Sequence, residues 1–110
     1  MTRRELLIGA AMLAVLPLVE GRAVAAGPRT HRIEMQNMRF GPVPANIKAG
    51  DTIIWVNRDI VPHTATARDR SFDVVIPSGR SVSMVVRRAG TIPFYCRYHP
   101  GMRGSLVAAR

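Results

Sequence analysis

Residues 31–109 consist of short runs in which apolar side chains alternate with polar ones, separated by Pro and Gly. The most strand-like run is residues 52–57 (T-I-I-W-V-N), which is rich in β-branched and aromatic residues. Residues 81–87 alternate over a longer stretch, with Val82, Met84 and Val86 on one predicted face. No stretch keeps a helical period for three turns, so the pattern predicts strands.

The same pattern predicts further extended segments, each bounded by turn residues. They lie at residues 31–37, 45–48, 63–67, 72–76, 92–96 and 105–109. A bend is predicted at residues 40–44, where one Gly and two Pro interrupt the alternation. About seven short strands at regular spacing, with no helix between them, are typical of an antiparallel sandwich. The sequence therefore predicts an all-β fold, a small Greek-key β-sandwich.

Residues 1–26 precede this pattern and have a different character. A short basic segment (1–4) is followed by an apolar run (6–19) and by the small-residue site A-V-A at 23–25. These three parts in this order predict a secretory signal peptide, cleaved after Ala25 or Ala26. The alternative is an uncleaved membrane anchor, but the apolar run is short for a membrane span and Pro17 interrupts it.

The expected export route depends on residues 2–7 (T-R-R-E-L-L), which resemble the twin-arginine motif of signals that export folded proteins. Arginine pairs also occur in ordinary signals, so twin-arginine and Sec export both stay open. Either route leads to a periplasmic location, and we expect no stable membrane span after cleavage. Residues 27–110 would then form one small domain.

A domain of this size often needs a cross-link, and this chain has one cysteine, Cys96, which cannot form an internal disulfide. A metal bond would occupy the thiol and connect loops that are distant in the sequence.

The charge balance is strongly basic. Residues 27–110 carry 13 Lys+Arg and 5 Asp+Glu, a net charge of about +8. Nothing resembles a recognition helix or a run of base-stacking aromatic residues, so we expect no nucleic-acid partner. The charge instead favours solubility and attraction to an acidic partner, with Arg97 and Arg103 nearest the candidate site described next.

Four candidate metal ligands stand in two short segments. Cys96, His99 and Met102 follow one another at intervals of three in C-R-Y-H-P-G-M, and His63 lies upstream in V-P-H-T. Taken singly, each has an ordinary reading as a loop histidine or a core residue. Together, one thiolate, two imidazoles and one thioether form the ligand set of a blue-copper site.

Other chemistries fit these residues less well. Structural zinc sites favour several Cys or His ligands and seldom use Met. A cysteine nucleophile would need oxyanion donors and a substrate cleft, and the sequence suggests neither, so we expect no enzyme.

The chain resembles the cupredoxins, and within them the amicyanin and pseudoazurin group of small type 1 copper proteins. The matching segments are residues 49–57, 61–64, 89–96 and 96–104 (A-G-D-T-I-I-W-V-N, V-P-H-T, A-G-T-I-P-F-Y-C and C-R-Y-H-P-G-M-R-G). The resemblance implies a cupredoxin-like sandwich that binds one copper ion, with His63, Cys96 and His99 as equatorial ligands and Met102 as the axial one.

It also implies a monomeric, mobile one-electron carrier whose partner is a cytochrome or an oxidoreductase with an acidic docking face. The partly exposed edge of His99 would provide the contact, beside Pro62, Pro100 and Gly101. The alternative is copper delivery or storage, with an auxiliary Cu(I) site at His31, Met35 and Met38. Against this alternative, His31 is expected at the surface and Met38 in the core.

One position departs from the family pattern. The family often has Asn directly after the first ligand histidine, where its side chain braces the Cys loop, and this chain has Thr64. Its backbone N–H could still donate to the Cys96 sulfur, and its hydroxyl could replace part of the Asn bridge. A threonine that faces solvent from a strand is the other reading.

Overall fold

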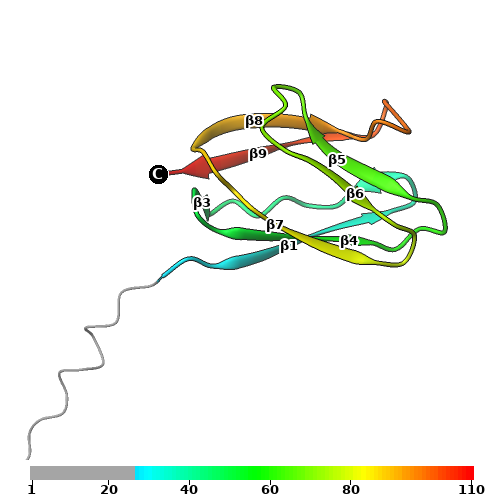
Figure 1. Cartoon of the computed structure of the whole chain (residues 1–110), viewed down its shortest axis with the longest axis horizontal. Helices are drawn as coiled ribbons and strands as arrows, with labels where there is room; N and C mark the ends of the chain where they lie inside the picture. The colour runs from blue at the N-terminus through cyan, green and yellow to red at the C-terminus, as the bar shows by residue number, and fades with distance from the viewer. Residues whose placement is uncertain (1–26) are drawn as a thin grey trace, which may run out of the picture.

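The computed structural model describes residues 27–110; the expected signal peptide, residues 1–26, lies outside the described residues. The described part contains strands and no helix, as predicted (Figure 1). Accordingly, the described chain offers no helix that is long and apolar enough for a membrane crossing. The strands are β1 (Thr30–Gln36), β2 (Arg39–Phe40), β3 (Ile47–Lys48), β4 (Thr52–Asn57), β5 (His63–Ala67), β6 (Asp73–Ile76), β7 (Ser81–Val85), β8 (Gly90–Tyr95) and β9 (Arg103–Ala109).

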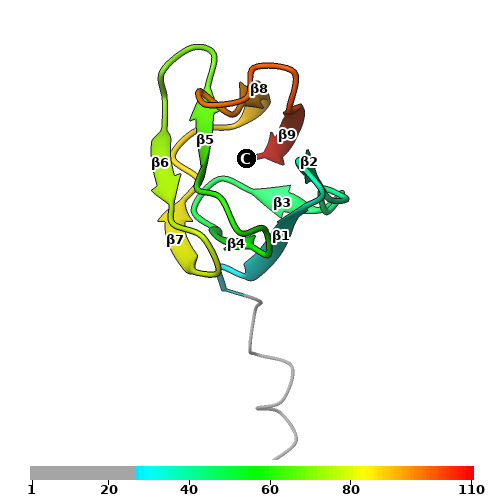
Figure 2. The ribbon, with the colours of Figure 1, turned by 90° about the vertical axis from the view of Figure 1, so that its right-hand side faces the viewer.

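The strands form two facing sheets, with the orders β2-β1-β4-β7 and β3-β9-β8-β5-β6. In the end-on view of Figure 2, β1 and β4 lie below β8 and β9. The chain changes sheet five times, after β2, β3, β4, β6 and β7, so the sandwich is confirmed. Two strand pairs, β1 with β4 and β3 with β9, are parallel. The antiparallel expectation missed them because alternation of side chains is the same in both strand directions.

The predicted bend at residues 40–44 begins later than expected, because β2 forms a small hairpin with β1. Gln36 pairs with Arg39, and the two residues between them, Asn37 and Met38, have φ values of 56° and 60°. Such left-handed pairs suit the twist of two-residue hairpins. Met38 therefore lies in the turn with 41% of its surface exposed, and the prediction that it belongs to the core is wrong.

Aromatic rings fill the space between the sheets. The ring centroid of Phe94 lies 4.7 Å from that of Phe40 and 5.2 Å from that of Trp55. Both pairs are edge-to-face, an arrangement that aromatic rings prefer. Cys96 and Met102 belong to the same buried cluster as these residues. The loop at residues 96–102, which carries three of the candidate ligands, therefore packs directly against the core.

His31 is buried, so its predicted surface position is wrong. Its Nε2 lies 2.8 Å from Oδ2 of Asp51, whose carboxylate also accepts hydrogen bonds from the backbone N–H groups of Arg29 and Lys48. These contacts hold the beginnings of β1 and β4 and the end of β3 together. Alternation along β1 could not show this partner, which is twenty residues away in the sequence.

Candidate metal centre

The loop between β8 and β9 fixes three of the candidate ligands relative to one another. The Cys96 N–H donates to the Met102 carbonyl at 2.9 Å, and the Met102 N–H donates to the His99 carbonyl at 2.8 Å. The His99 N–H in turn lies 3.3 Å from the Cys96 carbonyl. The loop is short and held by its own hydrogen bonds. Binding of a metal ion therefore costs little further conformational entropy in the loop.

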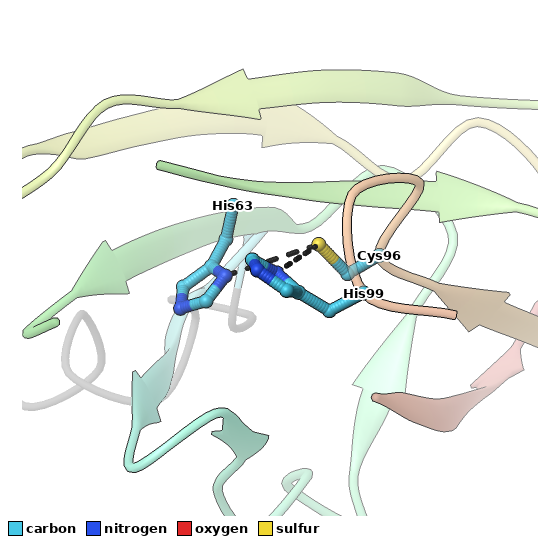
Figure 3. Close-up of side chains that lie close together, drawn as sticks. All are labelled: His63, Cys96 and His99. Atoms are coloured by element: carbon cyan, nitrogen blue, oxygen red, sulfur yellow. Dashed lines mark hydrogen bonds between the residues drawn. The ribbon is translucent and has the colours of Figure 1, made fainter. Parts of the chain in front are cut away.

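His63 reaches the same point from the first position of β5. Its Nδ1 lies 3.8 Å from the Cys96 sulfur, and Nδ1 of His99 lies 3.6 Å from it (Figure 3). The three ligand atoms all lie within 4.8 Å of one another. His63 and Cys96 are fully buried, whereas His99 is half-buried. The structure therefore brings together three of the four predicted residues around one point.

The fourth, Met102, is buried at the end of the same loop, with 4% of its surface exposed. Its backbone bonds to Cys96 and to His99 place its Cα beside both residues. Its role as the axial ligand stays a prediction.

Asp59, in the loop between β4 and β5, determines how His63 is presented. Its Oδ2 lies 2.7 Å from Nε2 of His63. This hydrogen bond is the main cause that lowers the pKa of the Asp59 carboxyl, with smaller contributions from the backbone N–H groups of Met38 and Asn37. An ionised carboxylate can only accept, so Nε2 carries a proton, and in the neutral ring the Nδ1 lone pair is left facing Cys96. The sequence analysis missed Asp59; a carboxylate four residues before a candidate ligand was the available signal.

Thr64 braces the Cys96 loop at two atoms. Its backbone N–H donates to the Cys96 sulfur at 3.3 Å, and its Oγ1 accepts the Arg97 N–H at 2.8 Å. The side chain is completely buried, so the reading as a solvent-facing threonine is wrong and the predicted brace is confirmed.

The donor chemistry of this site fits copper. Two imidazole nitrogens and one sulfur converge, and the sulfur also accepts an N–H hydrogen bond, which suits a thiolate. The auxiliary site is not assembled among residues 27–110, because His31 is bound to Asp51, Met35 is fully buried and Met38 lies in the β1–β2 turn.

The sequence model of the cupredoxin-like domain matches residues 9–108. The chain belongs to the cupredoxin-like family. Because the match begins before residue 27, it does not itself locate the start of the folded domain.

Several amicyanins, which are known cupredoxins, are similar to this chain. It is 26% identical to an amicyanin of Paracoccus denitrificans over 68% of this chain and 62% of that protein, and so spans less than two thirds of that relative. It is 29% identical to amicyanin-alpha of Methylorubrum extorquens over 89% of this chain and 90% of that protein. A structure of the Cu(I) form of an amicyanin mutant superposes with a TM-score of 0.62 at 27% identity, covering 79% of this chain and 87% of that one. The predicted resemblance is confirmed.

In this cupredoxin, the half-buried ring of His99 is the one imidazole of the cluster with access to solvent. Its ring centroid lies 5.2 Å from that of the buried His63. The start of β5, which carries His63, and the β8–β9 loop, which carries His99, therefore adjoin at one end of the sandwich, on the right in Figure 1.

Proposed function

We propose that this cupredoxin is a mobile one-electron carrier and not an enzyme, with one copper ion held by His63, Cys96, His99 and Met102. The observation that carries the proposal is the convergence of the first three ligand atoms within 4.8 Å, with only His99 partly exposed. Copper bound there supplies a Cu(II)/Cu(I) couple. The similar amicyanin structures include oxidised and reduced Cu(I) forms, which supports this choice of metal and chemistry.

The environment of the ligands favours retention of the metal. His63 and Cys96 are buried, and hydrogen bonds from Thr64 and to Asp59 hold them in place. A site whose ligands hardly move suits both oxidation states, because little rearrangement accompanies the gain or loss of an electron. Delivery of copper would instead call for open, exchangeable ligands.

The partner would approach over the ring of His99. Exposed apolar residues stand close to the two histidines in the sequence: Ile60, with 93% of its surface exposed, and Pro62 come before His63, and Pro100 follows His99. A small apolar contact of this kind suits a weak, rapidly released complex.

The charge of the domain supports an acidic partner, which we propose is a cytochrome or another oxidoreductase. Each Asp and Glu side chain of residues 27–110 already contacts a basic group or a histidine; the pairs are Glu34 with Arg58, Asp51 with His31, Asp59 with His63, Asp69 with Arg88, and Asp73 with Arg97. The remaining arginines, among them Arg103 next to Met102, leave a basic surface. Attraction of this kind accelerates encounter and weakens with salt.

The deciding experiment is titration of the purified protein with Cu(II), followed by ascorbate. The proposal expects an intense visible band that saturates at one copper per chain and bleaches on reduction. The Cys96→Ser variant should stay folded and lack the band. A pale spectrum, or immediate loss of copper to a mild chelator, would favour delivery or storage.

We also propose that residues 1–26 direct the protein to the periplasm, where it acts as a monomer. The N-terminal sequence of the periplasmic form should begin at residue 26 or 27. Replacing Arg3 and Arg4 together by Lys should block twin-arginine export and leave Sec export intact. Full-length protein in the membrane fraction would contradict cleavage, and elution as a dimer would contradict the monomer.

A further inference from the structure

We propose that Thr66 and Asp73 are positioning residues that hold the Cys96 loop through Thr64 and Arg97, and thereby tune the hydrogen bond to the Cys96 sulfur. This inference deepens the proposed function and rests on it for its spectroscopic consequences, while its structural part stands without copper.

The four residues form a closed ring of hydrogen bonds. The Arg97 N–H donates to Oγ1 of Thr64 at 2.8 Å, and Oγ1 of Thr64 lies 3.0 Å from Oγ1 of Thr66. The Thr66 hydroxyl donates to Oδ1 of Asp73 at 2.8 Å. Nε of Arg97 donates to the same oxygen at 3.1 Å and closes the ring.

The direction of each hydrogen bond in this ring is determined. A backbone N–H can only donate, and an ionised carboxylate can only accept. The hydrogen bond from Thr66, followed by the hydrogen bond and charge of Arg97, lowers the pKa of the Asp73 carboxyl. Since the single Thr66 proton goes to Asp73, the Thr64 hydroxyl must donate to Thr66. Each hydroxyl donates once and accepts once, so neither is free to rotate.

Both hydroxyl groups are sealed from water. Thr64 is fully buried and Thr66 is 2% exposed, so water cannot replace a lost partner. Side chains alternate along β5, and Ala65 and Ala67 belong to the core cluster, so the two threonines share the other face. Their hydroxyls therefore serve the contact with the β6 strand and the Cys96 loop rather than core packing.

The ring acts on Cys96 because Thr64 holds it at two points. The Thr64 N–H donates to the Cys96 sulfur at 3.3 Å, while its Oγ1 holds the next peptide N–H, that of Arg97. Asp73 holds the other end of Arg97, and its own side chain is 48% exposed. A change at Asp73 or Thr66 thus moves the peptide that follows Cys96. Hydrogen bonds to a metal-bound thiolate tune the potential of the metal.

The test compares Thr66→Val and Asp73→Ala with two controls. Thr66→Ser keeps the hydroxyl and should behave as the wild type. Asp69→Ala removes the same charge from another half-exposed ion pair, Asp69 with Arg88, which lies outside the ring. General electrostatic effects on the potential therefore appear in this control as well.

The first measurement is amide hydrogen exchange in the copper-free protein. Thr66→Val and Asp73→Ala should speed exchange of the Arg97 amide about tenfold relative to amides of β4, which report global opening. Thr66→Ser and Asp69→Ala should leave the ratio unchanged. An unchanged ratio in Thr66→Val would overturn the inference, whether or not the protein binds copper.

The second measurement is made on the copper-loaded protein. Thr66→Val should keep the intense band but shift its energy and the reduction potential, and weaken copper binding by about 10–100-fold. Equal shifts in Asp73→Ala and Asp69→Ala would reduce the role of Asp73 to its charge and overturn its assignment as a positioning residue. Absence of the band in the wild type would contradict the proposed function and leave the exchange result standing.

Discussion

Nε2 of His63 donates a hydrogen bond to Oδ2 of Asp59 at 2.7 Å, and the same carboxylate accepts the N–H groups of Asn37 and Met38. One side chain therefore orients a candidate metal ligand and also holds the left-handed turn between β1 and β2. The ligand end of the sandwich and its N-terminal hairpin are built as one unit.

Removing this carboxylate should separate its two effects. Asp59→Ala should weaken copper binding by roughly 10–100-fold, because the tautomer and ring of His63 are no longer fixed. It should also lower the free energy of unfolding by about 1–3 kcal/mol, because the N–H groups of the turn lose their acceptor. Asp59→Asn keeps one acceptor oxygen, so its loss of stability should be smaller. Competition with a chelator and denaturation of the copper-free protein measure the two effects; unchanged copper affinity would confine Asp59 to the turn.

The axial role of Met102 can be tested by Met102→Leu. The side chain is buried in the core cluster, and a swap that conserves volume should change the free energy of unfolding by less than about 1.5 kcal/mol. The intense band should persist, because the thiolate and both imidazoles remain. The reduction potential should rise, because an apolar side chain no longer donates to Cu(II). Voltammetry measures this, and an unchanged potential would contradict an axial thioether.

Gly104 is required by the close approach of Phe94. The two residues are paired across β8 and β9, and a Cβ at position 104 would lie 2.7 Å from Cζ of Phe94. The Phe94 ring is held by Phe40 and Trp55 and has little room to move. Gly104→Ala should therefore lower the free energy of unfolding by about 1–3 kcal/mol.

Gly101→Ala is the matched control for this substitution. No heavy atom lies within 4 Å of the new Cβ, and Gly101 does not have the left-handed backbone that favours glycine. Its free energy of unfolding should stay within about 0.5 kcal/mol of the wild type. Equal losses in both variants would mean that overpacking at Phe94 is not the cause.

Asp51 should make stability depend on pH in the acid range. The backbone N–H of Arg29, followed by the hydrogen bonds of His31 and the Lys48 N–H, lowers its pKa from 3.8 to about 2. A depressed native pKa stabilises the fold above the unfolded value and loses this effect as pH falls toward 2. The difference in unfolding free energy between wild type and Asp51→Asn should therefore be largest above pH 4 and shrink toward pH 2. The fluorescence of the single tryptophan, Trp55, can follow unfolding; a constant difference would contradict the role of ionised Asp51.

Much of this protein follows from local sequence. Residues 52–57 and 63–67 form strands with the predicted bounds, because β-branched and aromatic content, and alternation of side chains, are read over a few neighbours. Cys96, His99 and Met102 were recognisable because a loop of seven residues keeps them close whatever surrounds it. Local spacing also showed that Thr64, next to His63, lies where a brace is needed.

Tertiary structure alone decided the contacts that join distant segments. His31 with Asp51, Asp59 with the β1–β2 turn, and Thr66 with Asp73 and Arg97 depend on which strands become neighbours. Alternation assigns a side chain to a face but does not name the strand beside it or its direction, so the parallel pairs were missed as well. The sequence by itself determined the strands and the ligand types; packing of the sheets determined how each ligand is oriented, because hydrogen-bond partners are set by proximity in space.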